Sequence, residues 1–366
     1  MKITCLQENF KKAINIVQNI VGKNLTLPIL NNILLKTERG RLRLSSTNLE
    51  IGINTWVSGK IDKEGEITCP AKILTGFINN LPNKKIELEV KGNNLTVKCE
   101  NYRAKINCLS ADDFPIIPEI KADPIIEIVG STFREALSQV VGLSAISESR
   151  PEITGVFLVI EPNGIKLVAT DGFRLAEKKI NEIKNKKGLS QTIILPQRTT
   201  QELMRVLMDD EGELGIIIEN NQILFVFNET QIISRIIDGQ YPDYQQIIPN
   251  NFQATAITGK EEFLNSIKIA SLFSSRLNDV KIFVKNNKME ILSQESDLGE
   301  NLSSIPAEIK GKELEIVFNH RYLLDGLNNI KSAKISFGFN GEASPTVIRP
   351  AGDESYLYLI MPIKNN

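Results

Sequence analysis

The sequence predicts an α+β protein built from three tandem domains, each made of two β-α-β-β-β half-units. Two helix patterns, each written three times, and the strand-like runs between them carry this prediction. The first pattern begins at Phe10, Phe133 and Phe263, with large, small and aliphatic residues at offsets 0, +3, +4 and +7. These offsets place four side chains on one face of an α-helix. The starts lie 123 and 130 residues apart, which is too long for a solenoid and indicates tandem domains.

A second helix pattern begins at Pro70, Pro196 and Asn319, which lie 126 and 123 residues apart. Offsets +4, +8 and +11 are again mostly apolar, as one buried helix face requires. Offset +2 carries a cation in all three copies: Lys72, Arg198 and Arg321.

The first domain is expected to span residues 1–121, and alternating apolar residues define its strands. Turn residues at Arg39-Gly40 and Gly92-Asn93 predict hairpins, and Pro82 ends the second helix. The predicted elements are a strand at 3–5, a helix at 8–21, strands at 32–37, 41–45, 50–57 and 66–69, a helix at 71–81, and strands at 86–90, 94–100 and 103–109.

The same order is expected in a second domain, residues 122–245, and a third, residues 246–366. The second has strands at 125–129, 155–161, 164–170, 174–179, 192–195, 214–219, 222–228 and 231–236, with helices at 132–145 and 197–208. The third has helices at 260–273 and 321–330, and strands that include 280–284, 288–293, 314–318, 334–339, 344–350 and 356–360.

The composition is that of an ordinary globular protein, with 42% hydrophobic and 24% charged residues and a formal charge of −1. Neither a membrane span nor a signal peptide is predicted. Because the net charge is near zero, any nucleic-acid contact must come from a local basic patch. The four cysteines lack CxxC spacing and are expected to be buried thiols, with a disulfide or metal site as the less favoured alternative: Cys5, Cys69, Cys99 and Cys108.

No catalytic constellation stands out. His320 is the only histidine and opens a predicted helix, so a surface role at the helix end is favoured over catalysis. No Ser/His/Asp set, phosphate-binding loop or metal-ligand spacing is found, so no catalytic residue, metal or cofactor is expected.

The three repeated cations lie in the first helical turn, where a positive charge opposes the helix dipole. Their recurrence indicates a shared surface facing one polyanion through phosphate contacts. The alternative is that all three are ordinary solvated surface residues. If the six helices of one chain lined a closed ring, its bore would be only about 10 Å wide. Twelve helices from two chains give roughly 25–30 Å, enough for a B-DNA duplex of roughly 20 Å.

Four segments resemble the bacterial DNA polymerase III beta subunit family, the beta sliding clamps, and the resemblance covers the whole chain. They are Thr26–Asn32 (TLPILNN), Val168–Ala176 (VATDGFRLA), Asp238–Tyr244 (DGQYPDY) and the terminal pair Met361-Pro362. The resemblance implies three tandem DNA-clamp domains with helices lining a ring and antiparallel sheets outside. It also implies a non-catalytic processivity factor, a head-to-tail homodimer that encircles double-stranded DNA without sequence preference and acts in the cytoplasm. The implied partners are the polymerase III catalytic subunit, the clamp loader, and other polymerases and repair proteins with clamp-binding motifs. The alternative is a scaffold of the same fold that does not thread DNA.

The resemblance also implies site residues, carried over by matched position. The peptide-binding pocket is expected at Ile153, Thr170, Gly172, Phe173, Arg174, Leu175, Pro242, Ile247, Leu359, Ile360, Met361, Pro362 and Ile363. Arg174 is expected to anchor a peptide carbonyl or carboxylate, and Gln246 stands where the family commonly has an arginine. DNA contact is expected at Lys23, Asn24, Lys72, Arg150, Arg198 and Arg321. The dimer interface is expected to join Ala104, Ile106 and Cys108 on an edge strand to Leu272 and Phe273 of the partner.

Overall fold

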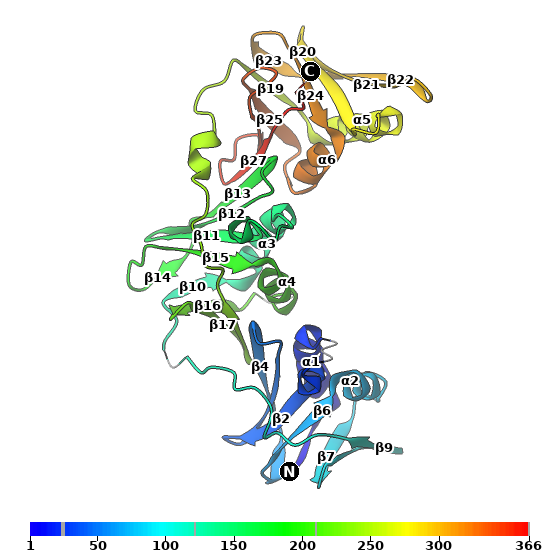
Figure 1. The fold of residues 1–366 in the computed structure, drawn as a ribbon, viewed down its shortest axis with the longest axis vertical. Helices are drawn as coiled ribbons and strands as arrows, with labels where there is room; N and C mark the ends of the chain where they lie inside the picture. The colour runs from blue at the N-terminus through cyan, green and yellow to red at the C-terminus, as the bar shows by residue number, and fades with distance from the viewer. Residues whose placement is uncertain (23–25, 121, 209–210, 365–366) are drawn as a thin grey trace. The chain divides into compact units, whose positions relative to one another are not determined.

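The computed structural model describes residues 1–22, 26–120, 122–208 and 211–364 of the chain. Its elements follow the order strand, α-helix and three strands six times, with one additional short strand, β5, β14 or β23, in each repeat (Figure 1). Three tandem repeats of two half-units each result, and the predicted α+β class is confirmed.

The six α-helices of the described residues fall where the two patterns place them. They are α1 (Gln7–Val17), α2 (Ala71–Asn79), α3 (Gly130–Val140), α4 (Gln197–Val206), α5 (Lys260–Ala270) and α6 (His320–Asn328). One 3-10 turn extends each of α1, α3 and α5, which accounts for the longer helices expected there: Gln18–Ile20, Val141–Leu143 and Ser271–Phe273. The three leading phenylalanines of the first pattern, Phe10, Phe133 and Phe263, are completely buried.

The strands of the first repeat are β1 (Lys2–Leu6), β2 (Asn32–Glu38), β3 (Arg41–Thr47), β4 (Ile51–Ser58), β5 (Lys60–Lys63), β6 (Glu66–Pro70), β7 (Lys85–Lys91), β8 (Asn94–Cys99) and β9 (Tyr102–Asn107). The second repeat has β10 (Ile126–Val129), β11 (Gly155–Glu161), β12 (Gly164–Thr170), β13 (Arg174–Ile180), β14 (Lys184–Asn185), β15 (Gln191–Pro196), β16 (Glu213–Glu219), β17 (Gln222–Phe227) and β18 (Thr230–Arg235). The third has β19 (Ala254–Gly259), β20 (Asp279–Lys285), β21 (Lys288–Glu295), β22 (Gly299–Pro306), β23 (Glu308–Gly311), β24 (Leu314–Asn319), β25 (Lys334–Phe339), β26 (Thr346–Pro350) and β27 (Tyr356–Ile360).

The two half-units of each repeat exchange their first strands. The strand before the first helix pairs with the second half-unit, as in β1–β7, β10–β16 and β19–β25. The strand before the second helix pairs back with the first half-unit, as in β6–β2, β15–β11 and β24–β20. Each half-unit therefore needs the other to complete its sheet.

The described residues form two compact units. Unit 1 comprises residues 1–134, 183–189 and 198–236, and unit 2 comprises residues 135–182, 190–197 and 237–366. Unit 1 contains a five-stranded sheet A, β5-β1-β7-β8-β9, and a nine-stranded sheet B, β14-β10-β16-β17-β18-β4-β3-β2-β6. Unit 2 contains a nine-stranded sheet C, β15-β11-β12-β13-β27-β26-β25-β19-β23, and a four-stranded sheet D, β22-β21-β20-β24. Each nine-stranded sheet thus joins strands of two neighbouring repeats.

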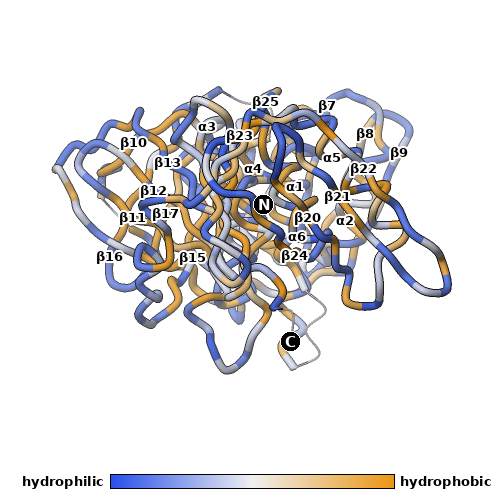
Figure 2. The backbone as a smooth tube through the Cα atoms, turned by 90° about the horizontal axis from the view of Figure 1, so that it is seen from above, coloured by the Kyte–Doolittle hydropathy of each residue, from blue (hydrophilic) through white to orange (hydrophobic). Residues whose placement is uncertain are grey.

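Helices pack in pairs within the units. In unit 1, α1 and α2 lie side by side (Figure 1), and the Gln7 side chain donates to the Ile78 carbonyl at 2.8 Å. In unit 2, α5 lies beside α6, and Lys260 Nζ donates to the Ile330 carbonyl that follows α6 (2.8 Å). Hydrophobic and hydrophilic segments are interleaved along the backbone (Figure 2), and burial alternates along strands such as β20, as expected where one sheet face is buried. No helix in the described part of the chain is long and apolar enough to cross a membrane.

Candidate functional site

The turn between β12 and β13 is fixed by two side chains that bond to its backbone. Thr170 Oγ1 accepts from the Gly172 N–H (3.1 Å) and donates to the Arg174 carbonyl (2.7 Å). Asp171 Oδ1 accepts from the N–H groups of Phe173 (2.9 Å) and Arg174 (3.0 Å). Gly172 has a φ of +90°, which residues with a side chain rarely adopt. The turn projects Phe173 outward, and its side chain is 61% exposed.

The first repeat contains the same turn. Thr47 Oγ1 accepts from the Leu49 N–H (3.0 Å) and donates to the Ile51 carbonyl (2.9 Å), and Asn48 Oδ1 accepts from the Ile51 N–H (2.8 Å). The turn is therefore a repeated structural device. The Phe173-Arg174 pair has no counterpart in the first repeat, where Glu50 and Ile51 stand at these positions.

Arg174 is held by groups of its own unit. Its Nε donates to Asp171 Oδ2 (2.9 Å), Nη1 donates to Asp325 of α6, and the guanidinium lies 4.3 Å from the ring centroid of Tyr322. Burial alone would lower the pKa of the guanidinium, but the Asp325 and Asp171 carboxylates outweigh it and raise the pKa above its ordinary value. Arg174 was expected to anchor a peptide, but two of its N–H donors bind Asp171 and Asp325 instead. These bonds link the turn to α6.

The C-terminal strand completes the site. β13 pairs with β27, with Leu175 opposite Leu359. Beyond the strand, the Met361 N–H donates to the Phe173 carbonyl at 2.9 Å. This bond brings Met361 beside the turn, although the two lie far apart in the sequence.

A cavity of about 450 Å³ opens between the turn, β27 and the 3-10 turn Tyr244–Ile247, all in unit 2. Seven of the thirteen residues expected in a pocket line it: Thr170, Gly172, Phe173, Arg174, Ile247, Leu359 and Met361. Gln246 and Pro345 complete the lining. A volume in this range and a mainly apolar wall suit a short peptide segment.

The other six expected residues do not line this cavity. Ile153 and Leu175 belong to the core cluster beneath it. Ile360 and Pro362 are buried, and Pro242 and Ile363 are half-buried. Pro345 was not among the residues expected in the pocket. A proline directly before a strand is nevertheless a typical strand-start signal.

The segment before β19 is anchored in the core cluster beneath the cavity by two buried tyrosines. Tyr241 stacks on Phe157, with ring centroids 4.4 Å apart, and Tyr244 donates its hydroxyl proton to Glu177 Oε2 at 2.7 Å. Burial first, and the Glu177 carboxylate second, raise the pKa of Tyr244 above its ordinary value. The phenol therefore stays protonated and keeps its hydrogen bond to Glu177.

The three repeated cations occupy equivalent places. Lys72, Arg198 and Arg321 are each the second residue of their helix, in α2, α4 and α6, and all three are exposed. Arg198 Nη2 reaches the Ile20 carbonyl at 3.4 Å. None of the three joins an ion pair with a described residue.

The remaining residues expected at DNA are placed in part. Lys23 and Asn24 lie outside the described residues. Arg150 is exposed, and its Nε forms an ion pair with Glu152 at 3.1 Å.

The residues expected at a dimer interface differ in exposure. Ala104 and Ile106 lie on β9, an edge of sheet A, while Cys108 lies just beyond that strand. The Ile106 and Cys108 side chains are buried within unit 1. In unit 2, Leu272 is 70% exposed and Phe273 half-buried, beside the free edge strand β22. Sequence reasoning missed β22 because few of its residues alternate clearly.

Two expectations about single residues have different outcomes. The expected surface position of His320 is wrong, since it begins α6 but is buried, and desolvation lowers its pKa. All four cysteines are buried free thiols, as expected. Cys69 Sγ lies 2.6 Å from Cys108 Sγ, a proximity that sequence spacing did not indicate. Among the described residues, no group of three His, Cys, Asp or Glu side chains could hold a metal ion.

Comparison with protein families gives three matches in chain order. Family models of the DNA polymerase III beta subunit match with the N-terminal domain at residues 1–118, the central domain at 127–243 and the C-terminal domain at 245–364. Together they span nearly the whole chain.

Individual relatives agree along their full lengths. The chain is 30% identical to the beta sliding clamp of Synechococcus elongatus, covering 100% of this chain and 99% of the relative. It is similar to the crystal structure of a DNA polymerase sliding clamp from Bacillus subtilis, with 29% identity, a TM-score of 0.94 and complete coverage of both chains. It is also similar to a DNA polymerase III subunit beta from Pseudomonas aeruginosa bound to griselimycin, with 27% identity, a TM-score of 0.94 and complete coverage of both chains.

Proposed function

This chain belongs to the DNA polymerase III beta subunit family and is a non-catalytic DNA polymerase processivity factor, and from that premise we propose that two copies close into a ring around double-stranded DNA. The ring slides along the duplex without reading its sequence. It tethers the polymerase III catalytic subunit through the cavity beside Phe173. Family membership does not favour the alternative of a scaffold that never threads DNA.

Strand pairing supports closure by two copies. Within the chain, β4 pairs with β18 and β13 pairs with β27, which joins neighbouring repeats edge to edge. The equivalent strands that remain are β22 and β9, and each is the edge of its sheet. An edge strand with unpaired backbone groups is a template for pairing with another chain. Pairing of β22 with β9 of a second copy, and the reverse, repeats the internal joint and closes a head-to-tail dimer.

The internal joints also give a register for this contact. Counting along the sheets makes Ile106 of β9 equivalent to Ile360 of β27, and Gly299 of β22 equivalent to Arg174 of β13. In the β13–β27 pairing within the chain, Arg174 lies opposite Ile360.

Transferred to the dimer, this register sets Glu300 opposite Lys105 of the second copy. Both side chains are exposed in the single chain. Opposite charges directly across an antiparallel pair are favourable. Leu302, which is 61% exposed, follows on the same strand and adds apolar area to this interface.

Duplex contact rests on the helix cations. Lys72, Arg198 and Arg321 recur at one helical position, and two copies supply six such charges. Lysine and arginine contacts to phosphates are independent of sequence and sensitive to salt. Such contacts hold a duplex loosely enough for sliding.

The cavity beside Phe173 suits short apolar peptide motifs. We assign it to the polymerase, the clamp loader, and other polymerases and repair proteins, which would compete for one site. These partners place the protein in the cytoplasm with the chromosome.

The proposed domains are residues 1–121, 122–245 and 246–366.

Retention on DNA of different topology tests the ring. The clamp loaded onto a nicked circular plasmid should stay bound through gel filtration and leave when the plasmid is linearised. The matched control is the same linear DNA with both ends blocked by a bound protein, which should restore retention. Equal retention on circular and open linear DNA would rule out topological linkage.

A further inference from the structure

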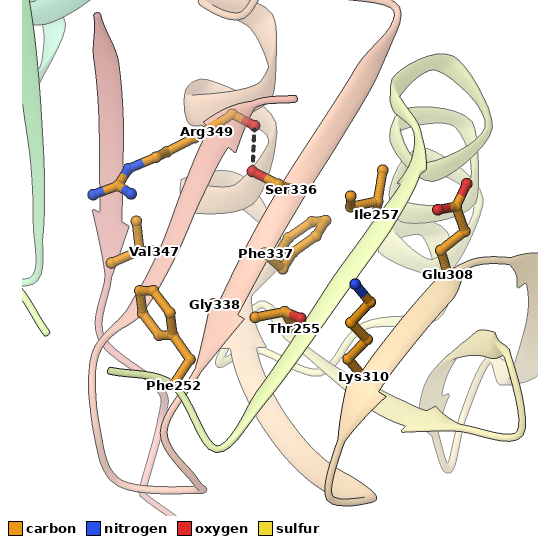
Figure 3. A pocket seen from close by; sticks show the side chains of 10 residues that line it. All are labelled: Phe252, Thr255, Ile257, Glu308, Lys310, Ser336, Phe337, Gly338, Val347 and Arg349. Carbon is orange, nitrogen blue, oxygen red and sulfur yellow. Dashed lines mark hydrogen bonds between the residues drawn. The ribbon is translucent and has the colours of Figure 1, made fainter. Parts of the chain in front are cut away.

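A second cavity, of about 300 Å³, lies on sheet C of unit 2 and shares no residue with the cavity beside Phe173. Figure 3 shows its side chains, which come from β19, β23, β25, β26 and the segment before β19. The opposite sheet face packs on α5, where the rings of Phe337 and Phe263 lie 4.9 Å apart. The cavity therefore occupies the face turned away from that helix.

The strand register builds the floor of this groove. Thr255 lies opposite Gly338, and Ile257 lies opposite Ser336, so all four share one face. Thr255, Ile257 and Ser336 are half-buried. The floor is thus a small, mostly apolar strip that remains open to solvent.

Phe252 forms one wall. A Cβ atom at Gly338 would come within 2.5 Å of the Phe252 ring, so the ring lies directly on the glycine. Phe252 also contacts the core cluster that contains Val347. The ring remains half-buried and offers an aromatic surface to the groove (Figure 3).

Two cations flank the groove. The Lys310 ammonium and the Arg349 guanidinium form no ion pair or side-chain hydrogen bond with any described residue. The nearby Glu308 carboxylate already has a partner, Lys334 Nζ, at 3.6 Å. The groove therefore has an excess of positive charge beside an aromatic wall.

We propose that this groove is a second binding site for a partner protein and takes an acidic peptide segment with one aromatic or large aliphatic side chain. The cavity volume fits one such side chain, which would pack between Phe252 and Ile257. Carboxylates on either side would meet Lys310 and Arg349. β23, the edge strand that carries Lys310, can also pair with an extended peptide backbone.

Fluorescence anisotropy with a labelled Asp-Glu-Phe-Asp-Glu peptide and the full-length dimer tests this site. The peptide should bind at least tenfold more tightly than a labelled Lys-Arg-Phe-Lys-Arg peptide. Lys310→Glu combined with Arg349→Glu should weaken the acidic peptide at least tenfold, and Thr255→Trp should do the same by filling the groove. The charge-matched control Lys85→Glu with Lys98→Glu, two exposed lysines of unit 1, should leave binding unchanged.

Four outcomes would overturn the proposal. Unchanged binding by both groove variants would place the peptide elsewhere. Loss of binding in Phe173→Ala with Met361→Ala would assign the peptide to the first cavity. Displacement by oligothymidylate, or a change in dimer mass caused by the groove variants, would make the groove a nucleic-acid or self-association surface instead.

Discussion

At the scale of single residues, Arg174 and Met361 are the positions that test the function of the cavity beside Phe173. Replacing both by alanine removes one wall of the cavity and frees Asp171 and Asp325 of their shared cation. We expect the double variant to abolish polymerase stimulation in primer extension on a primed circular template. Arg174→Ala should lower the free energy of unfolding by about 1–2 kcal/mol, because hydrogen bonds to charged groups are lost. The dimer should keep its mass in sedimentation equilibrium.

The equivalent turn of the first repeat supplies the control. Leu49→Ala with Glu50→Ala changes exposed residues in a turn of the same geometry. This variant should stimulate the polymerase normally. If the Arg174→Ala, Met361→Ala variant still stimulates the polymerase fully, the polymerase does not bind at this cavity.

Residue identity could be predicted better than residue surroundings. The turn at Thr170-Asp171-Gly172 could be predicted from the sequence, because hydrogen bonds between its own side chains and the nearby backbone define it. Arg174 could be singled out, but its two carboxylate partners include Asp325, 151 residues away in the chain. No sequence pattern links such positions. His320 was misjudged for the same reason, since Asn278 and Asp279, which lie close to it, are distant in the sequence.

At the scale of elements, the cations at the start of α2, α4 and α6 make a joint prediction. Reversing Lys72, Arg198 and Arg321 to glutamate should weaken duplex binding and flatten its salt dependence. Each phosphate contact contributes roughly 0.9 to the slope of log K against log salt. Measuring duplex affinity of the unloaded dimer between low and moderate salt checks this. The control reverses three exposed lysines outside the helices, Lys85, Lys98 and Lys312.

The interpretation of that experiment depends on the slope. A uniform loss of affinity with an unchanged slope in both variants would mean that net charge alone matters. An unchanged affinity in the helix variant would leave the three cations as ordinary surface residues.

Long periodic elements were predictable, and short or swapped ones were not. All six helices fall on the predicted stripes because one buried face fixes the period. β5, β14 and β23 contain four, two and four residues, too few to show alternation. They occupy equivalent places, pairing with β1, β10 and β19. The exchange of first strands between half-units was also hidden, since either pairing buries the same side chains.

At the scale of the whole molecule, two charges test whether the ring closes head to tail. Glu300→Lys should set like charges across both contacts of the dimer, and so should Lys105→Glu. Cross-strand charge pairs are worth roughly 0.2–1 kcal/mol each, so two contacts predict about tenfold weaker dimers. Sedimentation equilibrium of each variant measures the change, with Lys85→Glu as an exposed-charge control.

Mixing the two variants gives the sharper result. In a head-to-tail ring, one chain with Glu300→Lys and one with Lys105→Glu restore opposite charges at both contacts. One contact keeps the original Glu300–Lys105 pair, and the other has the same pair reversed. The mixture should therefore form a heterodimer about as stable as the original dimer, while either variant alone forms the weaker dimer predicted above. A mixture no more stable than its separate components would show that β22 does not meet β9 in this register, because no other pairing of the two sites cancels both repulsions together.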